Sequence, residues 1–139
     1  DIPHAATTVV VRNVPRAYTQ EELIQEWVPD GSFNYVHLPQ RGKMEPFGYA
    51  FVNFVSHKHL ERFQERWHGR YLSKHSFARP LDVAAATTQG LQSNLACLQG
   101  IKAHALRKAG ALPMIFQGTT RLDTWALISG MGLTTASWQ

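Results

Sequence analysis

The alternation of apolar and polar positions divides the chain into short strands and amphipathic helices. A β-branched run over residues 8–14 stops at Pro15, which lacks the amide hydrogen that a sheet ladder needs. We predict a strand there, and further strands over residues 33–38, 48–54 and 81–85. The last is weak in propensity, because alanine is a poor strand former, and we place it mainly from its position in the order.

Two helices are predicted between these strands. Thr19 and Glu22 have the spacing of a capping box, and Ser56 can cap a second helix. The apolar faces are Leu23 and Trp27 in the first helix, and Leu60, Phe63 and Trp67 in the second. The order over about residues 8 to 86 is therefore β-α-β-β-α-β, an α+β arrangement with a four-stranded antiparallel sheet and both helices on one face.

Beyond residue 90 the pattern changes to a helix and then to an apolar tail. Leucines at positions 91, 95 and 98 keep helical spacing, so we predict a third, C-terminal helix that ends near Lys108. The apolar segment 112–116 is expected to dock on the domain, and the tail beyond it is a candidate mobile segment. The expected division is a flank (1–7), a strand and helix domain (8–86), a docked helical extension (87–116) and the tail (117–139).

The sheet face without helices is the candidate functional surface. Side chains alternate along a strand, so Tyr49, Phe51 and Asn53 share one face of the third strand. A nucleobase can cover exposed rings, because every base has a π-face and such stacking is worth about 1 to 3 kcal/mol per base. The same alternation adds three residues from the first two strands to this face: Arg12, Tyr35 and His37.

Two segments resemble a known family. Residues 47–54, FGYAFVNF, resemble the RNP1 signature of the RNA recognition motif (RRM), and residues 9–14, VVVRNV, resemble its RNP2 partner. More narrowly, RNVP at 12–15, YT at 18–19, LP at 38–39, QG at 89–90 and PMIF at 113–116 resemble the C-terminal RRM of the Mei-two-like RNA-binding proteins. This resemblance covers roughly residues 7 to 116. It implies a ferredoxin-like fold, single-stranded RNA binding without catalysis, and proteins that regulate meiosis and differentiation in fungi and plants through RNA.

The chain departs from the family pattern at two positions. Val10 replaces the usual aromatic of RNP2, and Phe47 replaces the usual Lys or Arg at the first position of RNP1. Arg12 lies on the face of Val10 and could restore a cation or stack its guanidinium on a base. Arg41 and Lys43, in the loop between the second and third strands, could hold phosphates as that loop often does in RRMs, or could be solvated loop charges.

The charge balance makes a polyanionic partner plausible without requiring one. The chain has 139 residues and a formal net charge of +4. Residues 1–86 hold ten Lys and Arg against nine Asp and Glu, a net of +1, whereas residues 87–139 hold four against one, a net of +3. The extension is thus the more basic part, and affinity through the sheet alone should be modest.

The remaining composition argues against several other classes. A single cysteine, Cys97, permits no internal disulfide and is typical of a reducing compartment, so we expect an intracellular protein of the nucleus or cytoplasm. The longest uncharged run, residues 83–101, carries too many polar side chains for a membrane helix. His57 and His59 lack a metal-ligand spacing, and no nucleophile and base pair is evident, so we expect neither a metal, a cofactor nor an enzyme.

A rival hypothesis is that the third helix permanently covers the sheet. The domain would then serve protein interaction or self-association, with the apolar tail and its Trp125 and Trp138 at the interface. If RNA is the partner instead, replacing Phe51 by alanine should weaken its binding by about 1 to 3 kcal/mol with the fold intact. No motif separates RNA from single-stranded DNA, because that distinction depends on contacts to the 2′-hydroxyl.

Overall fold

The computed structural model describes residues 2–39, 46–75 and 79–135. Its first six elements follow the predicted β-α-β-β-α-β order, and five more elements come after them. The bounds are β1 Thr8–Pro15, α1 Gln20–Glu26, β2 Phe33–His37, β3 Phe47–Phe54, α2 His57–Trp67, β4 Asp82–Ala85, α3 Leu91–Ala96, α4 Gly100–Lys108, β5 Met114–Gln117, β6 Thr120–Leu122 and α5 Thr124–Gly130. The prediction of a ferredoxin-like α+β fold is confirmed.

The sheet has six strands where four were expected. Their order is β4-β1-β3-β2-β5-β6, and every neighbouring pair is antiparallel. The apolar segment predicted to dock on the domain instead pairs with β2, with Tyr35 opposite Ile115 and Val36 opposite Met114. In a four-stranded sheet β2 would be an edge strand, whose unpaired backbone groups can accept another strand. The C-terminal extension, which in the structure comprises residues 87–135, pairs with this edge at Tyr35 and Val36.

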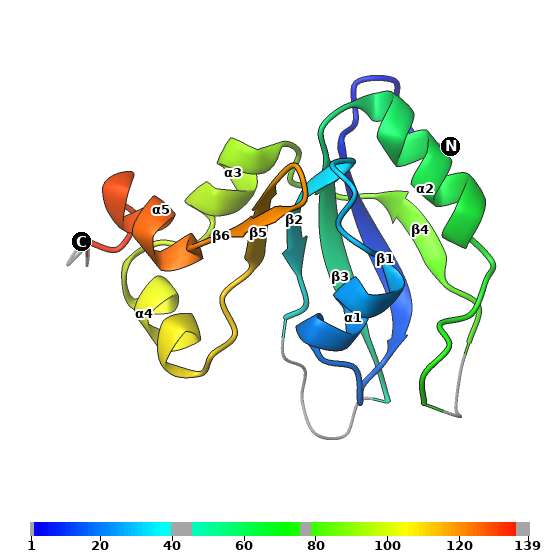
Figure 1. Ribbon diagram of the computed structural model, residues 1–139, viewed down its shortest axis with the longest axis horizontal. Helices are drawn as coiled ribbons and strands as arrows, with labels where there is room; N and C mark the ends of the chain where they lie inside the picture. Colours follow the sequence, from blue (N-terminus) through cyan, green and yellow to red (C-terminus); the bar gives the residue numbers. More distant parts are fainter. Residues whose placement is uncertain (1, 40–45, 76–78, 136–139) are drawn as a thin grey trace.

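Helices α1 and α2 cover one face of this sheet, as Figure 1 shows. The predicted capping box is present, because the Glu22 amide donates to the Thr19 hydroxyl at 3.1 Å and the Thr19 amide donates to the Glu22 carboxylate at 3.0 Å. The main core lies between these helices and the sheet, and its fully buried members include Val9, Val11, Leu23, Val36, Ala50, Val52 and Leu60. The apolar alternation along β1 and β3 therefore faces the helices as expected.

The predicted third helix is broken into α3 and α4. Gln99 leaves helical geometry (φ −115°, ψ 151°), and Gly100 has a positive φ of 52°. The Gly100 amide donates to the carbonyl of Leu133 at 2.7 Å, a tertiary contact that leucine spacing does not reveal. The break lets α4 turn back beside α5, and Figure 1 shows α3, α4 and α5 gathered around β5 and β6.

Much of the segment from residue 117 onward is folded, in contrast to the expected mobile tail. Strand β6 pairs with β5, with Gln117 opposite Thr120, and the Asp123 carboxylate caps α5 by accepting from the Ala126 amide at 3.0 Å. Ile128 on α5 is fully buried. This segment adds to a second apolar cluster rather than extending into solvent. Across the described residues, no helix combines the length and the apolar character that crossing a bilayer requires.

Candidate nucleic-acid interface

The sheet face opposite α1 and α2 divides into two parts. We call Arg12 of β1 together with Tyr49 and Phe51 of β3 the open half. We call Tyr35 and His37 of β2 together with Ile115 of β5 the covered half, since α3, α4 and α5 pack over it. The six positions share one side of the sheet by strand alternation, so their different environments come from the extension.

Tyr35 is a core residue of the covered half. Only 3% of its surface is exposed, and it belongs to a cluster of buried residues that also contains Leu95, Leu98, Ala103, Ile115 and Ile128. Burial raises the pKa of the Tyr35 hydroxyl, because the charged form would lose its hydration. In this conformation the ring is not accessible to a base, in contrast to the sequence expectation.

His37 is also buried, with 8% of its surface exposed. Burial, with a smaller contribution from the positive charge of Lys102, lowers its pKa to about 4. Its Nδ1 atom lies 3.3 Å from the Gln20 side-chain oxygen, which also accepts from the Leu38 amide at 2.8 Å. At neutral pH the ring is therefore uncharged and supplies no cation to a phosphate.

Asn53 ties the start of the extension to the sheet. It is 3% exposed, and its side-chain oxygen accepts from the Thr8 hydroxyl at 2.6 Å and the Thr7 hydroxyl at 2.9 Å. The Thr8 hydroxyl in turn accepts from the Gly90 amide at 2.9 Å. A buried polar group needs such partners, so Asn53 has a structural role here and is not part of an exposed binding face, in contrast to the sequence expectation.

The open half keeps its two rings partly exposed. Tyr49 and Phe51 lie edge to face, with ring centroids 5.3 Å apart and planes at 63°. Cross-strand pairing places Arg12 beside Tyr49 and Val10 beside Phe51. Phe51 also packs against the cluster of the extension, so it marks the boundary between the two halves.

Arg12 stands at the outer side of the open half. It is exposed, and its guanidinium lies 3.1 Å from the Asp82 carboxylate on β4. An exposed ion pair of this kind is worth at most about 1 kcal/mol, so an anion can compete for the guanidinium. The pair lowers the net positive charge of this surface.

Three residues that the sequence did not single out for binding lie near the start of β3. The Arg79 guanidinium carbon lies 4.5 Å from the centroid of the Phe47 ring. Asn13 has a positive φ of 71° at the irregularity between β1 and β3, and its side-chain amide donates to the Pro80 carbonyl at 2.9 Å. Asparagine tolerates left-handed backbone and could have marked an irregularity. Nothing local points to Arg79.

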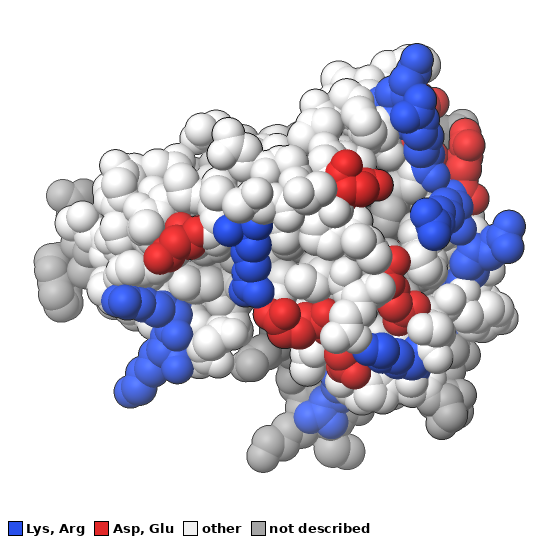
Figure 2. Space-filling model, in the orientation of Figure 1, with Lys and Arg blue, Asp and Glu red and all other residues white. Residues whose placement is uncertain are grey.

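Arg41 and Lys43, the two loop cations that could hold phosphates or be solvated, lie outside the described residues. The side of the sheet covered by α1 and α2 carries mixed charge: Figure 2 shows basic side chains interspersed with acidic ones on that side. Arg62 and Arg66 are exposed there beside Glu61 and Glu65, as expected for a solvated helix face. A single-sign field that would attract a polyanion is not evident on that side.

Comparison with known proteins places the chain in a family. The model of RNA recognition motif 2 matches residues 6–99, more than half of the chain. The chain therefore belongs to this family of RRM domains, as the RNP1 and RNP2 resemblances predicted.

Individual relatives narrow the resemblance. The chain is 31% identical over 87 residues to protein MEI2-like 2 of Arabidopsis thaliana, covering 60% of this chain and 10% of the relative. It is 28% identical over 96 residues to MEI2-like 5 of the same plant, covering 67% and 12%. The second RRM of the yeast poly(U)-binding protein Pub1 matches with 20% identity and a TM-score of 0.48, covering 61% of this chain and 99% of that one. The predicted similarity to Mei-two-like proteins is confirmed.

Proposed function

We propose that this domain binds single-stranded RNA along the open half of its sheet, within a Mei-two-like regulator of RNA fate. The observation that carries the proposal is the pair of partly exposed rings, Tyr49 and Phe51, beside an exposed arginine on the central strands of an RRM. Each ring can stack a base, and Arg12 can approach a phosphate or stack on a neighbouring base.

Burial of the covered half restricts the proposed RNA-binding surface to the open half. Tyr35, His37 and Asn53 are buried under the extension, and His37 is neutral at physiological pH. We therefore assign the contacts to β1 and β3, and we expect a short binding register of few nucleotides. Few cations among the described residues lie on this surface, so we expect modest affinity with a shallow salt dependence.

The regulatory role is inferred from the relatives. The chain spans about a tenth of the length of the curated MEI2-like proteins that it matches. The proposal concerns this RNA-binding step, and the fate of the bound RNA would depend on the whole protein.

The rival hypothesis of a sealed sheet receives less support. Helices α3 and α4 pack over the β2 side, whereas Tyr49 and Arg12 on the other side keep exposed surface. Trp125, which was expected at an interface, is partly buried and packs within the extension, where Arg107 stacks on its ring at 4.2 Å. Trp138, the other tryptophan of that hypothesis, lies outside the described residues. Self-association would therefore have to use other surfaces.

The decisive experiment is a binding titration with a pool of short random single-stranded RNAs. Amide shifts of the labelled domain should concentrate at Arg12, Tyr49 and Phe51. Tyr49→Ala should weaken binding by about 1 to 3 kcal/mol, roughly 5- to 150-fold, because it removes one stacking platform. Tyr71→Ala, at an exposed tyrosine on the loop after α2, is the matched control and should leave the affinity unchanged.

Two outcomes count against the proposal. An affinity that Tyr49→Ala leaves unchanged would remove the stacking role of this ring, and the absence of any shift at high RNA concentration would reject the RNA interface altogether. Repeating the titration with deoxyribonucleotides of the same sequences measures the contribution of the 2′-hydroxyl.

A further inference from the structure

We propose that Arg79 is a phosphate-binding residue that extends the RNA site beyond the end of the open half, with Phe47 as its platform and Asn13 as its positioning residue. This inference rests on the proposed function and assigns a further part of the same site. It concerns a residue outside the sheet, in the segment that leads into β4.

The stacking geometry leaves the guanidinium ready for an anion. Its carbon lies 4.5 Å from the Phe47 ring centroid, so the positive charge faces the π-system while the side chain stays exposed. A stacked guanidinium is held in place through its face, which keeps its N–H groups available for charge-assisted hydrogen bonds to phosphate oxygens.

Arg79 also differs from Arg12 in its charge environment. Arg12 lies 3.1 Å from Asp82, whereas no carboxylate in the described part of the chain lies within ion-pair distance of Arg79. Among the described residues, the charge of Arg79 is therefore less compensated than that of Arg12. Of these two arginines, Arg79 is the stronger attractor of a polyanion.

The position of Phe47 makes it continuous with the open half. Phe47, Tyr49 and Phe51 occupy alternate positions of β3 and so share one face, spaced about 6 to 7 Å apart along the strand. Pairing of Phe47 with Pro15 puts this ring where β1 ends and β3 begins. A strand stacked on Phe51 and Tyr49 and continuing in that direction arrives at the guanidinium of Arg79.

Backbone contacts fix the segment that carries Arg79. The β-bulge at Asn13 turns its side chain toward the Pro80 carbonyl, which it reaches at 2.9 Å. The next residue, Leu81, is buried, and its amide donates to the Arg70 carbonyl at 2.8 Å. Bulges commonly re-aim a side chain near a functional site, and this one secures the residue that follows Arg79.

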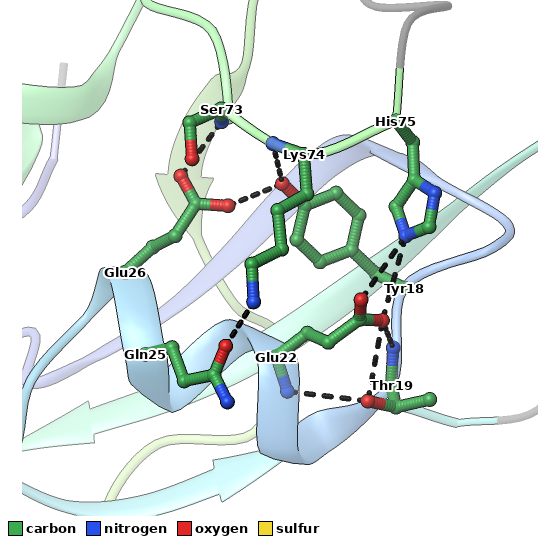
Figure 3. A network of polar contacts seen from close by, with 8 residues as sticks. All are labelled: Tyr18, Thr19, Glu22, Gln25, Glu26, Ser73, Lys74 and His75. Carbon is green, nitrogen blue, oxygen red and sulfur yellow. Dashed lines mark hydrogen bonds and ion pairs between the residues drawn. The ribbon is translucent and has the colours of Figure 1, made fainter.

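The preceding residues are anchored on α1 by a polar network, which Figure 3 shows. The Ser73 amide donates to the Glu26 carboxylate at 2.7 Å, and the Lys74 amide donates to the Tyr18 hydroxyl at 2.7 Å. The Tyr18 hydroxyl itself donates to Glu26, and His75 lies 3.3 Å from Glu22. Residues 73–75 and 80–81 are thus held by the rest of the domain, which limits the conformational entropy that these residues lose when RNA binds.

The test compares arginine variants by fluorescence anisotropy with a labelled random RNA pool at several salt concentrations. Arg79→Gln should weaken binding roughly 3- to 10-fold and reduce the slope of log affinity against log salt by about 0.7, the value for one phosphate of a single strand. The matched control is Arg66→Gln, because Arg66 is also exposed and stacked on a ring, Trp67 at 5.8 Å, but lies on the helix side. It should change neither quantity.

Two further variants test the proposed arrangement. Arg79→Lys should preserve the salt slope and recover only part of the affinity, because a lysine keeps the charge without the planar fork. Asn13→Gly keeps a residue suited to positive φ and removes the hydrogen bond to Pro80. It should weaken RNA binding in the unaltered chain and have no further effect when combined with Arg79→Gln.

The outcomes separate this inference from the proposed function. If Tyr49→Ala weakens binding while Arg79→Gln leaves both affinity and salt slope unchanged, RNA binds the open half and the role of Arg79 is wrong. An equal loss in Arg66→Gln would show a diffuse charge effect and overturn the assignment as well. If the unaltered chain does not bind RNA, both proposals fail together.

Discussion

The two halves of one sheet face have the same kind of residues and opposite environments. The covered half presents Tyr35 and His37 on β2, and the open half presents Tyr49 and Phe51 on β3, each pair in alternating positions. The first pair is buried by the extension, whereas the second keeps exposed surface. An aromatic ring on an RRM sheet is therefore a structural or a binding residue according to what packs over it.

The largest expected effect is on the stability of the covered half. Tyr35→Ala should lower the free energy of unfolding by about 3 to 5 kcal/mol, because it leaves a cavity beneath the extension. Urea denaturation measures this, with Tyr71→Ala as the control: its side chain is 57% exposed, and its loss should change stability by less than about 0.5 kcal/mol. A cost below about 1 kcal/mol for Tyr35→Ala would mean that the extension does not hold this half.

The second largest effect is a pH dependence of the free energy of unfolding that comes from His37. Its pKa is about 4 in the folded chain against an ordinary value of 6.5, so the unfolded chain binds more protons between these values. Stability is unaffected by this group above about pH 6.5. Below that pH the free energy of unfolding falls, and the loss reaches about 3 kcal/mol by pH 4.

Denaturation of the unaltered chain and of His37→Gln between pH 7 and pH 4 isolates this contribution, since other titrating groups are common to both. The free energy of unfolding of the unaltered chain minus that of His37→Gln should fall by about 3 kcal/mol from pH 7 to pH 4, because only the unaltered chain carries the titrating ring. A difference that stays constant over this range would contradict the burial of His37.

Phe51 should show both kinds of effect, because it lies at the boundary. Phe51→Ala should weaken RNA binding by about 1 to 3 kcal/mol and should also lower stability by about 1 to 2 kcal/mol, since the ring packs against the extension. The sequence alone suggested an unchanged fold for this variant. Unfolding and RNA affinity are measured for both Phe51→Ala and Tyr49→Ala, and the comparison locates the boundary between the halves. If Phe51→Ala lowers affinity without lowering stability, Phe51 belongs fully to the open half.

The smallest expected effect is stronger RNA binding by the open half. Asp82→Asn removes the carboxylate that lies 3.1 Å from Arg12, and it should strengthen RNA binding by roughly 2- to 5-fold at low salt. The control is Glu65→Gln, which removes an exposed carboxylate from the helix side. Weaker binding by Asp82→Asn than by the unaltered chain would show that the ion pair orients Arg12 for its role.

Much of the domain followed from local patterns. The capping box at Thr19, the cap at Ser56 and the alternation along β1 and β3 were all present in the structure, because each depends on neighbours in the chain. The family could also be recognised from RNP1 and RNP2. Even the weak alanine-containing strand formed, since pairing with β1 outweighs its low intrinsic propensity.

The extension was the part that local patterns described poorly. Leucine spacing predicted one helix, but Gly100 begins a new one through a contact with Leu133, more than thirty residues away. The apolar segment at Met114 became a strand because β2 offered an edge. The site changed as a result, since Tyr35 and His37 were covered by elements whose positions depend on these distant contacts.

Local sequence patterns were enough to predict the class of fold, the two RNP strands and the face on which their aromatic side chains lie, because strand alternation and helix capping are set by residues close in the chain. The three-dimensional packing was needed to show which aromatic residues on that face stay exposed and that Arg79 lies over Phe47. Burial and stacking depend on contacts between segments distant in sequence, and the periodicity of one segment does not specify what covers it.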